Sequence, residues 1–77
     1  MVQAFVLIQC NDLCVEQVIV DLKKVESVKE IQGLLGMYDV VIKVQAKDTV
    51  EMDKMISTQI RTIEKLRSTV TLIVSEE

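Results

Sequence analysis

The chain has 77 residues, the size of one small domain; 49% of them are hydrophobic, the net charge is −3, and the sequence pI is about 4.9. An acidic chain without a cluster of Lys and Arg lacks the positive surface that binds nucleic-acid phosphates, and no apolar run approaches the roughly 20 residues that span a membrane. There is no histidine, which removes the commonest general base and metal ligand.

The hydrophobic residues exceed what a core of this size can use. A chain this short buries roughly 60% of the surface that its unfolded state exposes. Aromatic residues make up only 3%, so the excess consists of Val, Ile, Leu and Met. Aliphatic surface on a small domain commonly ends in a subunit interface, and we therefore expect this chain to self-associate.

The first half of the chain predicts a strand, a helix and a second strand. Residues 2–9 (VQAFVLIQ) are almost continuously apolar, as in a central strand that is covered on both faces. Asn11 and Asp12 are good N-cap residues, and the apolar positions after them recur at the spacing of one helix face: Val15, Val18, Ile19 and Leu22. Residues 28–35 (VKEIQGLL) are more polar, which is typical of an edge strand.

The second half repeats that order after a tight turn. Residues 36–39 (GMYD) predict the turn, because glycine tolerates positive φ and Asp can hydrogen-bond the turn backbone. Val40–Ala46 (VVIKVQA) predicts a buried strand. Asp48 predicts the N-cap of a helix that runs to about Lys65 along an apolar stripe: Met52, Met55, Ile56, Ile60 and Ile63. Residues 68–75 alternate with period two, with Val70, Leu72 and Val74 on one face and Thr69, Thr71 and Ile73 on the other.

The order βαββαβ predicts one α+β domain over residues 1–77, with a ferredoxin-like sandwich fold. Right-handed crossovers place the first and third strands in the middle of a four-stranded antiparallel sheet and both helices on one face. The other face carries no helix, so some of its apolar side chains would be exposed in a monomer: Phe5, Leu7, Val41 and Ile73. We expect a second sheet to cover this face in a dimer.

No pair of a nucleophile and a base is evident, and the sequence therefore predicts no catalytic residue, no cofactor and no enzyme. Cys10 and Cys14 lie where the first strand meets the first helix, close to the place where small metal carriers of this fold have a Cys-x-x-Cys pair. The spacing here is one residue longer, and no third soft ligand accompanies the pair. The two cysteines are interpreted either as buried thiols of a reducing cytoplasm or as a metal or redox site.

The turn and the last strand carry a resemblance to a known family, the effector-binding (RAM) domain of the Lrp/AsnC, or feast/famine, transcriptional regulators. The Gly-x-Tyr-Asp of that family stands here as residues 36–39 (GMYD), and its Thr-x-Thr as residues 69–71 (TVT). The match in element order covers essentially the whole chain. The family often has a hydroxyl residue where this chain has Leu35, and Gly-Val where it has Lys65 and Leu66.

The resemblance implies a non-catalytic amino-acid sensor that takes part in transcription regulation, of cytoplasmic and prokaryotic type. It implies sheet-to-sheet dimers that assemble further, often to octamers, with a small amino acid bound between dimers. Because the sequence begins at the first strand, we expect a stand-alone form without the helix-turn-helix, which binds no DNA itself and modulates full-length Lrp/AsnC regulators by co-assembly.

The ligand-binding residues that this resemblance implies are Leu34, Gly36, Met37, Tyr38, Asp39, Thr69 and Thr71. Backbone N–H groups of the turn would donate to the ligand carboxylate, and Asp39 would accept from its ammonium. The two threonines would add hydroxyl groups, and Leu34 would favour a small or branched apolar side chain.

Three other interpretations share this fold. An ACT-like domain would also bind an amino acid. A metal or redox carrier would use Cys10 and Cys14. A small dimeric oxygenase is the third, and the lack of histidine and the scarcity of aromatic residues count against it.

Overall fold

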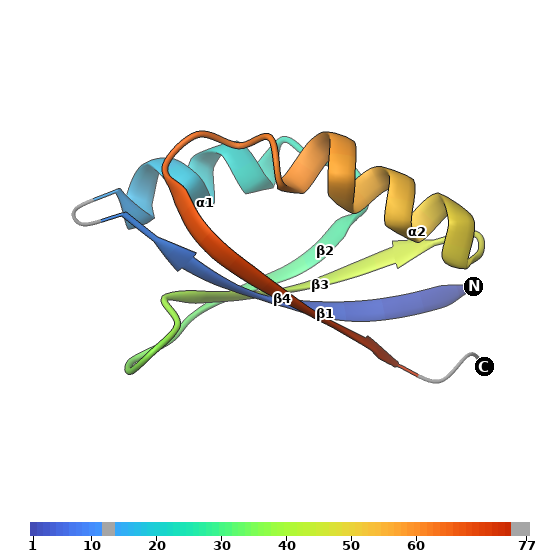
Figure 1. Ribbon diagram of the computed structural model, residues 1–77, viewed down its shortest axis with the longest axis horizontal. Helices are drawn as coiled ribbons and strands as arrows, with labels where there is room; N and C mark the ends of the chain where they lie inside the picture. Colours follow the sequence, from blue (N-terminus) through green and yellow to red (C-terminus); the bar gives the residue numbers. More distant parts are fainter. Residues whose placement is uncertain (12–13, 75–77) are drawn as a thin grey trace.

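The computed structural model describes residues 1–11 and 14–74. The elements follow in the order β1 (Val2–Cys10), α1 (Val15–Lys23), β2 (Val28–Gly33), β3 (Val40–Ala46), α2 (Thr49–Met55), η1 (Ile56–Ile60) and β4 (Leu66–Val74). Both helices lie on the same face of one sheet (Figure 1). The predicted α+β, ferredoxin-like βαββαβ sandwich is confirmed.

The four strands form one antiparallel sheet in the order β2-β3-β1-β4. The two apolar strands β1 and β3 are therefore central and the two more polar strands are at the edges, as the sequence predicts. β3 begins at Val40 and ends at Ala46 as expected, whereas β2 ends at Gly33, two residues earlier than predicted.

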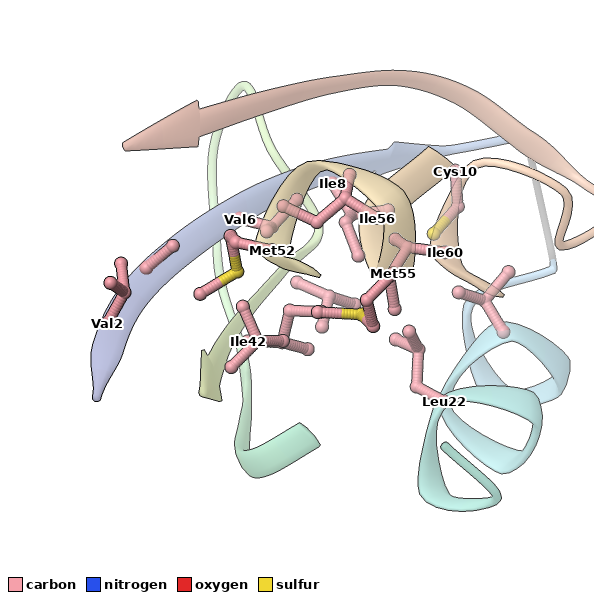
Figure 2. Close-up of a cluster of buried hydrophobic side chains, with 14 residues drawn as sticks. Val2, Val6, Ile8, Cys10, Leu22, Ile42, Met52, Met55, Ile56 and Ile60 are labelled. Atoms are coloured by element: carbon pink, nitrogen blue, oxygen red, sulfur yellow. The ribbon is translucent and has the colours of Figure 1, made fainter. Parts of the chain in front are cut away.

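The core lies between the sheet and the helices (Figure 2). Alternate residues of β1 point into it, and all of them are buried: Val2, Ala4, Val6, Ile8 and Cys10. They meet Val40, Ile42 and Val44 of β3, and the helices contribute Val18, Leu22, Met52, Met55, Ile56 and Ile60. Both predicted helical stripes thus face the sheet. No polar side chain of the described residues is buried, so core stability depends on aliphatic packing.

The start of α1 differs from the expectation. The prediction that Asn11 caps this helix is wrong, because Cys14 occupies the cap position and makes no side-chain hydrogen bond to the helix. The Asn11 carbonyl oxygen instead accepts a hydrogen bond from the Cys14 N–H at 3.1 Å. The other expected cap, Asp12, lies outside the described residues.

The second helix begins as predicted and ends earlier. Asp48 caps it, and its Oδ1 accepts a hydrogen bond from the Glu51 N–H at 2.8 Å. After Met55 the backbone widens into the π-helical segment η1, where the Arg61 N–H donates to the Ile56 carbonyl five residues back at 2.9 Å. The expected end near Lys65 is wrong, because Lys65 has φ +76°, a left-handed conformation that no α-helix continues through.

The sheet face without helices carries apolar side chains. Residues that pair directly across antiparallel strands share a face, so Phe5 lies beside Leu72 and Leu7 lies beside Val70. Phe5 is 39% exposed and Leu72 is 52% exposed. Ile73 is a correction to the expected set: it pairs with the buried Ala4, so it lies on the helix side, although it is 52% exposed.

Candidate functional site

The turn between β2 and β3 has the backbone that its sequence predicts. Gly36 adopts φ +124°, a backbone conformation that residues with a Cβ rarely adopt. The Leu34 N–H donates to the Asp39 carbonyl at 2.8 Å and closes the loop. The turn projects from the end of the sheet, on the side away from the helices (Figure 1). Its tip is open to solvent, and Met37 is 78% exposed.

Asp39 fastens this turn to the central strand β1. Its Oδ2 accepts a hydrogen bond from the Cys10 N–H at 2.7 Å, and its own N–H donates to the Ile8 carbonyl at 2.9 Å. Within residues 1–11 and 14–74, its other oxygen Oδ1 accepts no hydrogen bond. Asp39 thus has a structural task, and one carboxylate oxygen remains available to a ligand.

The turn also has unused donors. The backbone N–H groups of Gly36, Met37 and Tyr38 donate to no acceptor in the part of the chain that the structure describes. Buried backbone donors are almost always paired, whereas donors on an open turn are paired by water or by a ligand. These three groups can therefore bind an anion without breaking any bond of the fold.

Gln9 connects the turn to β4 across β1. Its Nε2 donates to the Met37 carbonyl at 3.2 Å, and its Oε1 accepts from the Ser68 hydroxyl at 3.0 Å. The sequence analysis did not include Gln9. A signal is present in the sequence, because Gln9 and Gln3 are the two polar residues of a strand that is otherwise apolar.

Thr69 and Thr71 lie on the helix side of β4, where they pair with Ile8 and Val6 of β1. They line a groove of about 360 Å³ together with Asp53, Ile56, Ser57 and Arg61. The turn residues do not line this groove. One chain therefore does not bring residues 34–39 and the two threonines together around one ligand.

Asp53, Ser57 and Arg61 were not predicted as site residues. Their spacing of four residues places them on one face of the helix that α2 and η1 form, opposite the threonines. This spacing was visible in the sequence, but only the position of β4 shows which face of the helix it belongs to.

The two cysteines are unpaired thiols in different surroundings. Cys10 is buried, whereas Cys14 is partly buried. Burial raises the pKa of the Cys10 thiol, and the nearby Asp39 carboxylate and Cys14 raise it further. Among residues 1–11 and 14–74 there is no group of three or more His, Cys, Asp or Glu side chains placed to hold a metal ion.

The fold defines a small α+β domain with two helices on one face of a four-stranded antiparallel sheet. The profile of the Lrp/AsnC ligand binding domain matches residues 3–77. The chain belongs to this family, which confirms the resemblance that the turn and the last strand indicate.

Relatives with described activities include the homocitrate synthases of Saccharolobus solfataricus and of Saccharolobus islandicus. Each is 34% identical to this chain over 74 residues, which is 95% of the chain. The chain spans only 16% of the length of these enzymes. The similarity is therefore confined to one small part of a much larger protein.

Several solved structures share the fold over nearly the whole chain. FFRP-DM1 has a TM-score of 0.93 at 29% identity, and the alignment covers 97% of this chain and 100% of that one. A hypothetical protein from Pyrococcus horikoshii has a TM-score of 0.92 at 30% identity, covering 100% and 93%. E. coli AsnC has a TM-score of 0.92 at 26% identity; the match covers 99% of this chain and 52% of AsnC.

In the part of the chain that the structure describes, no helix has the length and apolar character needed to cross a membrane.

Proposed function

We propose that this chain is a non-catalytic sensor of a small amino acid, which assembles through the open face of its sheet and modulates regulators of its own family. The observation that carries the proposal is the turn. Gly36, Met37 and Tyr38 present three unpaired backbone donors, and Asp39 has one free carboxylate oxygen beside them. This combination suits a zwitterion, because the donors bind a carboxylate and the acid binds an ammonium.

The proposal also covers the type of ligand side chain and the assembly of the subunits. Leu34 is partly buried next to the turn and favours a small or branched apolar side chain. The hydroxyl groups of Thr69 and Thr71 complete the site only if they come from another chain, because within one chain they lie apart from the turn. The site is therefore proposed at a contact between subunits, in a homo-oligomer of dimers up to an octamer.

The comparisons support a sensing role. The same domain matches a small part of the homocitrate synthases and about half of E. coli AsnC. A domain that occurs both in an enzyme and in a protein of a different kind is expected to have a function that both can use. The Lrp/AsnC family is described as a ligand-binding domain, and ligand binding is such a function. Co-assembly with full-length regulators in the cytoplasm belongs to the proposal.

Calorimetric titration with each of the twenty amino acids tests this function. We expect a few amino acids with short or branched apolar side chains to bind, each with one molecule per subunit. If none of the twenty produces binding heat while the protein is folded and assembled, the sensor proposal is wrong.

A further inference from the structure

Gln9 lies on β1 with its side chain on the open face of the sheet. It pairs directly with Ser68 of β4, and its neighbours Ile8 and Cys10 point into the core. The turn projects toward the same side of the sheet, away from the helices (Figure 1). Gln9 therefore lies between the turn, where we propose that an effector binds, and the face where we propose that a second copy packs.

The side-chain amide of Gln9 has a defined direction. The Met37 carbonyl can only accept, so Nε2 donates to it at 3.2 Å, and Oε1 accepts from the Ser68 hydroxyl at 3.0 Å. A reversed amide would place Oε1 against the Met37 oxygen, and two acceptors repel each other. The hydrogen bonds therefore form a directed chain that begins on β4 and ends on the turn.

This chain of bonds continues through the peptide group that joins Met37 to Tyr38. The peptide is trans, so its C=O and its N–H point in nearly opposite directions. The Met37 C=O is directed at Gln9, and the Tyr38 N–H is therefore directed away from it. Within residues 1–11 and 14–74 this N–H donates to no acceptor. It is one of the donors that the proposed effector site uses.

Packing does little to fix the orientation of this peptide. Met37 is 78% exposed, and Gly36 before it has no side chain. A rotation of the peptide plane changes only ψ of Met37 and φ of Tyr38, which is the difference between common turn types. The bond from Gln9 to the Met37 carbonyl opposes that rotation. Loss of this bond would leave the Tyr38 N–H without a fixed direction.

A second copy on the open face would strengthen the chain of bonds. Gln9 is half-buried and Ser68 is exposed in one subunit, so water competes for both bonds. Hydrogen bonds are stronger where water is excluded, and each bond in a directed chain polarises the next. A carboxylate bound to the Tyr38 N–H lies at the far end of this chain. Assembly and effector binding should therefore favour each other, since coupling between two sites is reciprocal.

We propose that Gln9 is a positioning residue, which directs the Tyr38 N–H toward the effector carboxylate and couples that site to the dimer through Ser68. This inference rests on the proposed function and adds to it the regulation of the same site. Gln9 acts through the peptide between Met37 and Tyr38 and needs no contact with the effector.

The backbone amide resonance of Tyr38 in the ¹⁵N-labelled chain tests this position without a ligand. Gln9→Leu removes the donor at similar size, and Gln9→Glu keeps the shape but has only acceptors when ionised. Both should move the Tyr38 resonance. Gln3 is the matched control, because it lies on the same strand and face at the opposite end. Gln3→Leu and Gln3→Glu should leave the resonance in place, and equal effects of the Gln9 and Gln3 variants would contradict the proposal.

Leu72→Glu tests the coupling to the dimer. This change on the open face lies four residues along β4 from Ser68 and should dissociate the dimer, which sedimentation equilibrium measures. In the wild-type background it should move the Tyr38 resonance, because water regains access to Gln9. In the Gln9→Leu background it should cause no further movement, since the connection is already lost. Equal movement in both backgrounds, or movement in neither, would rule out coupling through Gln9.

Calorimetry with L-alanine and L-valine separates positioning from stability. Gln9→Leu should weaken binding of the probes about tenfold, whereas the dimer should be as tight or tighter because leucine adds apolar area to the interface. Unchanged binding, or parallel weakening of binding and of the dimer, would overturn the proposal. If neither probe binds the wild type, that result counts against the sensor function, and the Leu72→Glu comparison still confirms or rules out the coupling.

Discussion

The carboxylate of Asp39 accepts a hydrogen bond from the backbone N–H of Cys10, with 2.7 Å between Oδ2 and N. This bond joins the last residue of the turn to the last residue of the central strand β1. The two residues are 29 positions apart in sequence. The bond is charge-assisted and fixes where β3 begins relative to β1. The conformation of the turn and the register of the two central strands are therefore linked by a single side chain.

Replacing Asp39 should lower the free energy of unfolding. Asp39→Ala removes the acceptor of the partly buried Cys10 N–H, which should cost about 1–3 kcal/mol. Asp39→Asn keeps an oxygen and should cost less. Urea unfolding of the wild type and the two variants measures their free energies of unfolding, which should fall in the order wild type, Asp39→Asn, Asp39→Ala. If Asp39→Ala is as stable as the wild type, the bond does not contribute to stability.

Replacing Lys65 by glycine should stabilise the domain. Lys65 has φ +76°, where an L-residue with a Cβ costs about 1–2 kcal/mol and glycine does not. Glycine loses about 0.5–1 kcal/mol through the greater freedom of the unfolded chain, so the net gain is between about 0 and 1.5 kcal/mol. Lys65→Ala is the control, since it removes the charge and keeps the Cβ. Equal melting temperatures for the two variants would contradict the strain.

Assembly through the open sheet face should depend on the side of β4 that is changed. Leu72 and Ile73 are neighbours and are both 52% exposed, but Leu72 lies on the open face and Ile73 on the helix side. Leu72→Glu should dissociate the dimer, because the dimer would bury an unpaired charge, whereas Ile73→Glu should leave the dimer intact. Light scattering of both variants measures the mass. A wild-type mass of 8.7 kDa at micromolar concentration would show that no dimer forms.

Cys10 should react slowly and should make stability pH-dependent in alkaline solution. Burial raises the pKa of its thiol, and Asp39 and Cys14 raise it further, so the folded state holds the proton more tightly than the unfolded state. The free energy of unfolding should therefore fall as the pH rises above the ordinary thiol value of about 8.5. Cys10→Ala should flatten this slope. Near neutral pH, iodoacetamide should modify Cys14 before Cys10, and equal rates would contradict the buried position of Cys10.

The apolar pattern of the sequence predicts the strand order and most faces of this fold, although it does not predict the end of β2 or the side on which Ile73 lies. Val40–Ala46 has a glycine turn before it and a capping Asp48 after it, and both ends of β3 were predicted correctly. The end of the second helix was not, since Ile63 continues the apolar stripe although the helix has already widened at Ile56. Nothing in the residue types of this segment indicates a π-helical turn or a lysine with positive φ.

The site was less predictable than the fold. Gly36 could be assigned its positive φ from residue type, whereas the bond from Cys10 to Asp39 depends on the strand register. The link through Gln9 depends on it too. The groove beside β4 depends on how the second helix lies over the sheet, which no local pattern states.

The most direct test of the sensor is the melting-temperature shift that an amino acid produces, measured for the wild type, Asp39→Asn and Asp48→Asn. The two aspartates are matched, since each accepts one backbone N–H, at 2.7 and 2.8 Å. A ligand at about 100 times its dissociation constant adds roughly 2.7 kcal/mol, a shift on the order of 10 °C for a domain of this size. We predict this shift in the wild type and in Asp48→Asn, and its loss in Asp39→Asn. An undiminished shift in Asp39→Asn, or no shift in the wild type with any amino acid, would contradict the proposed effector site.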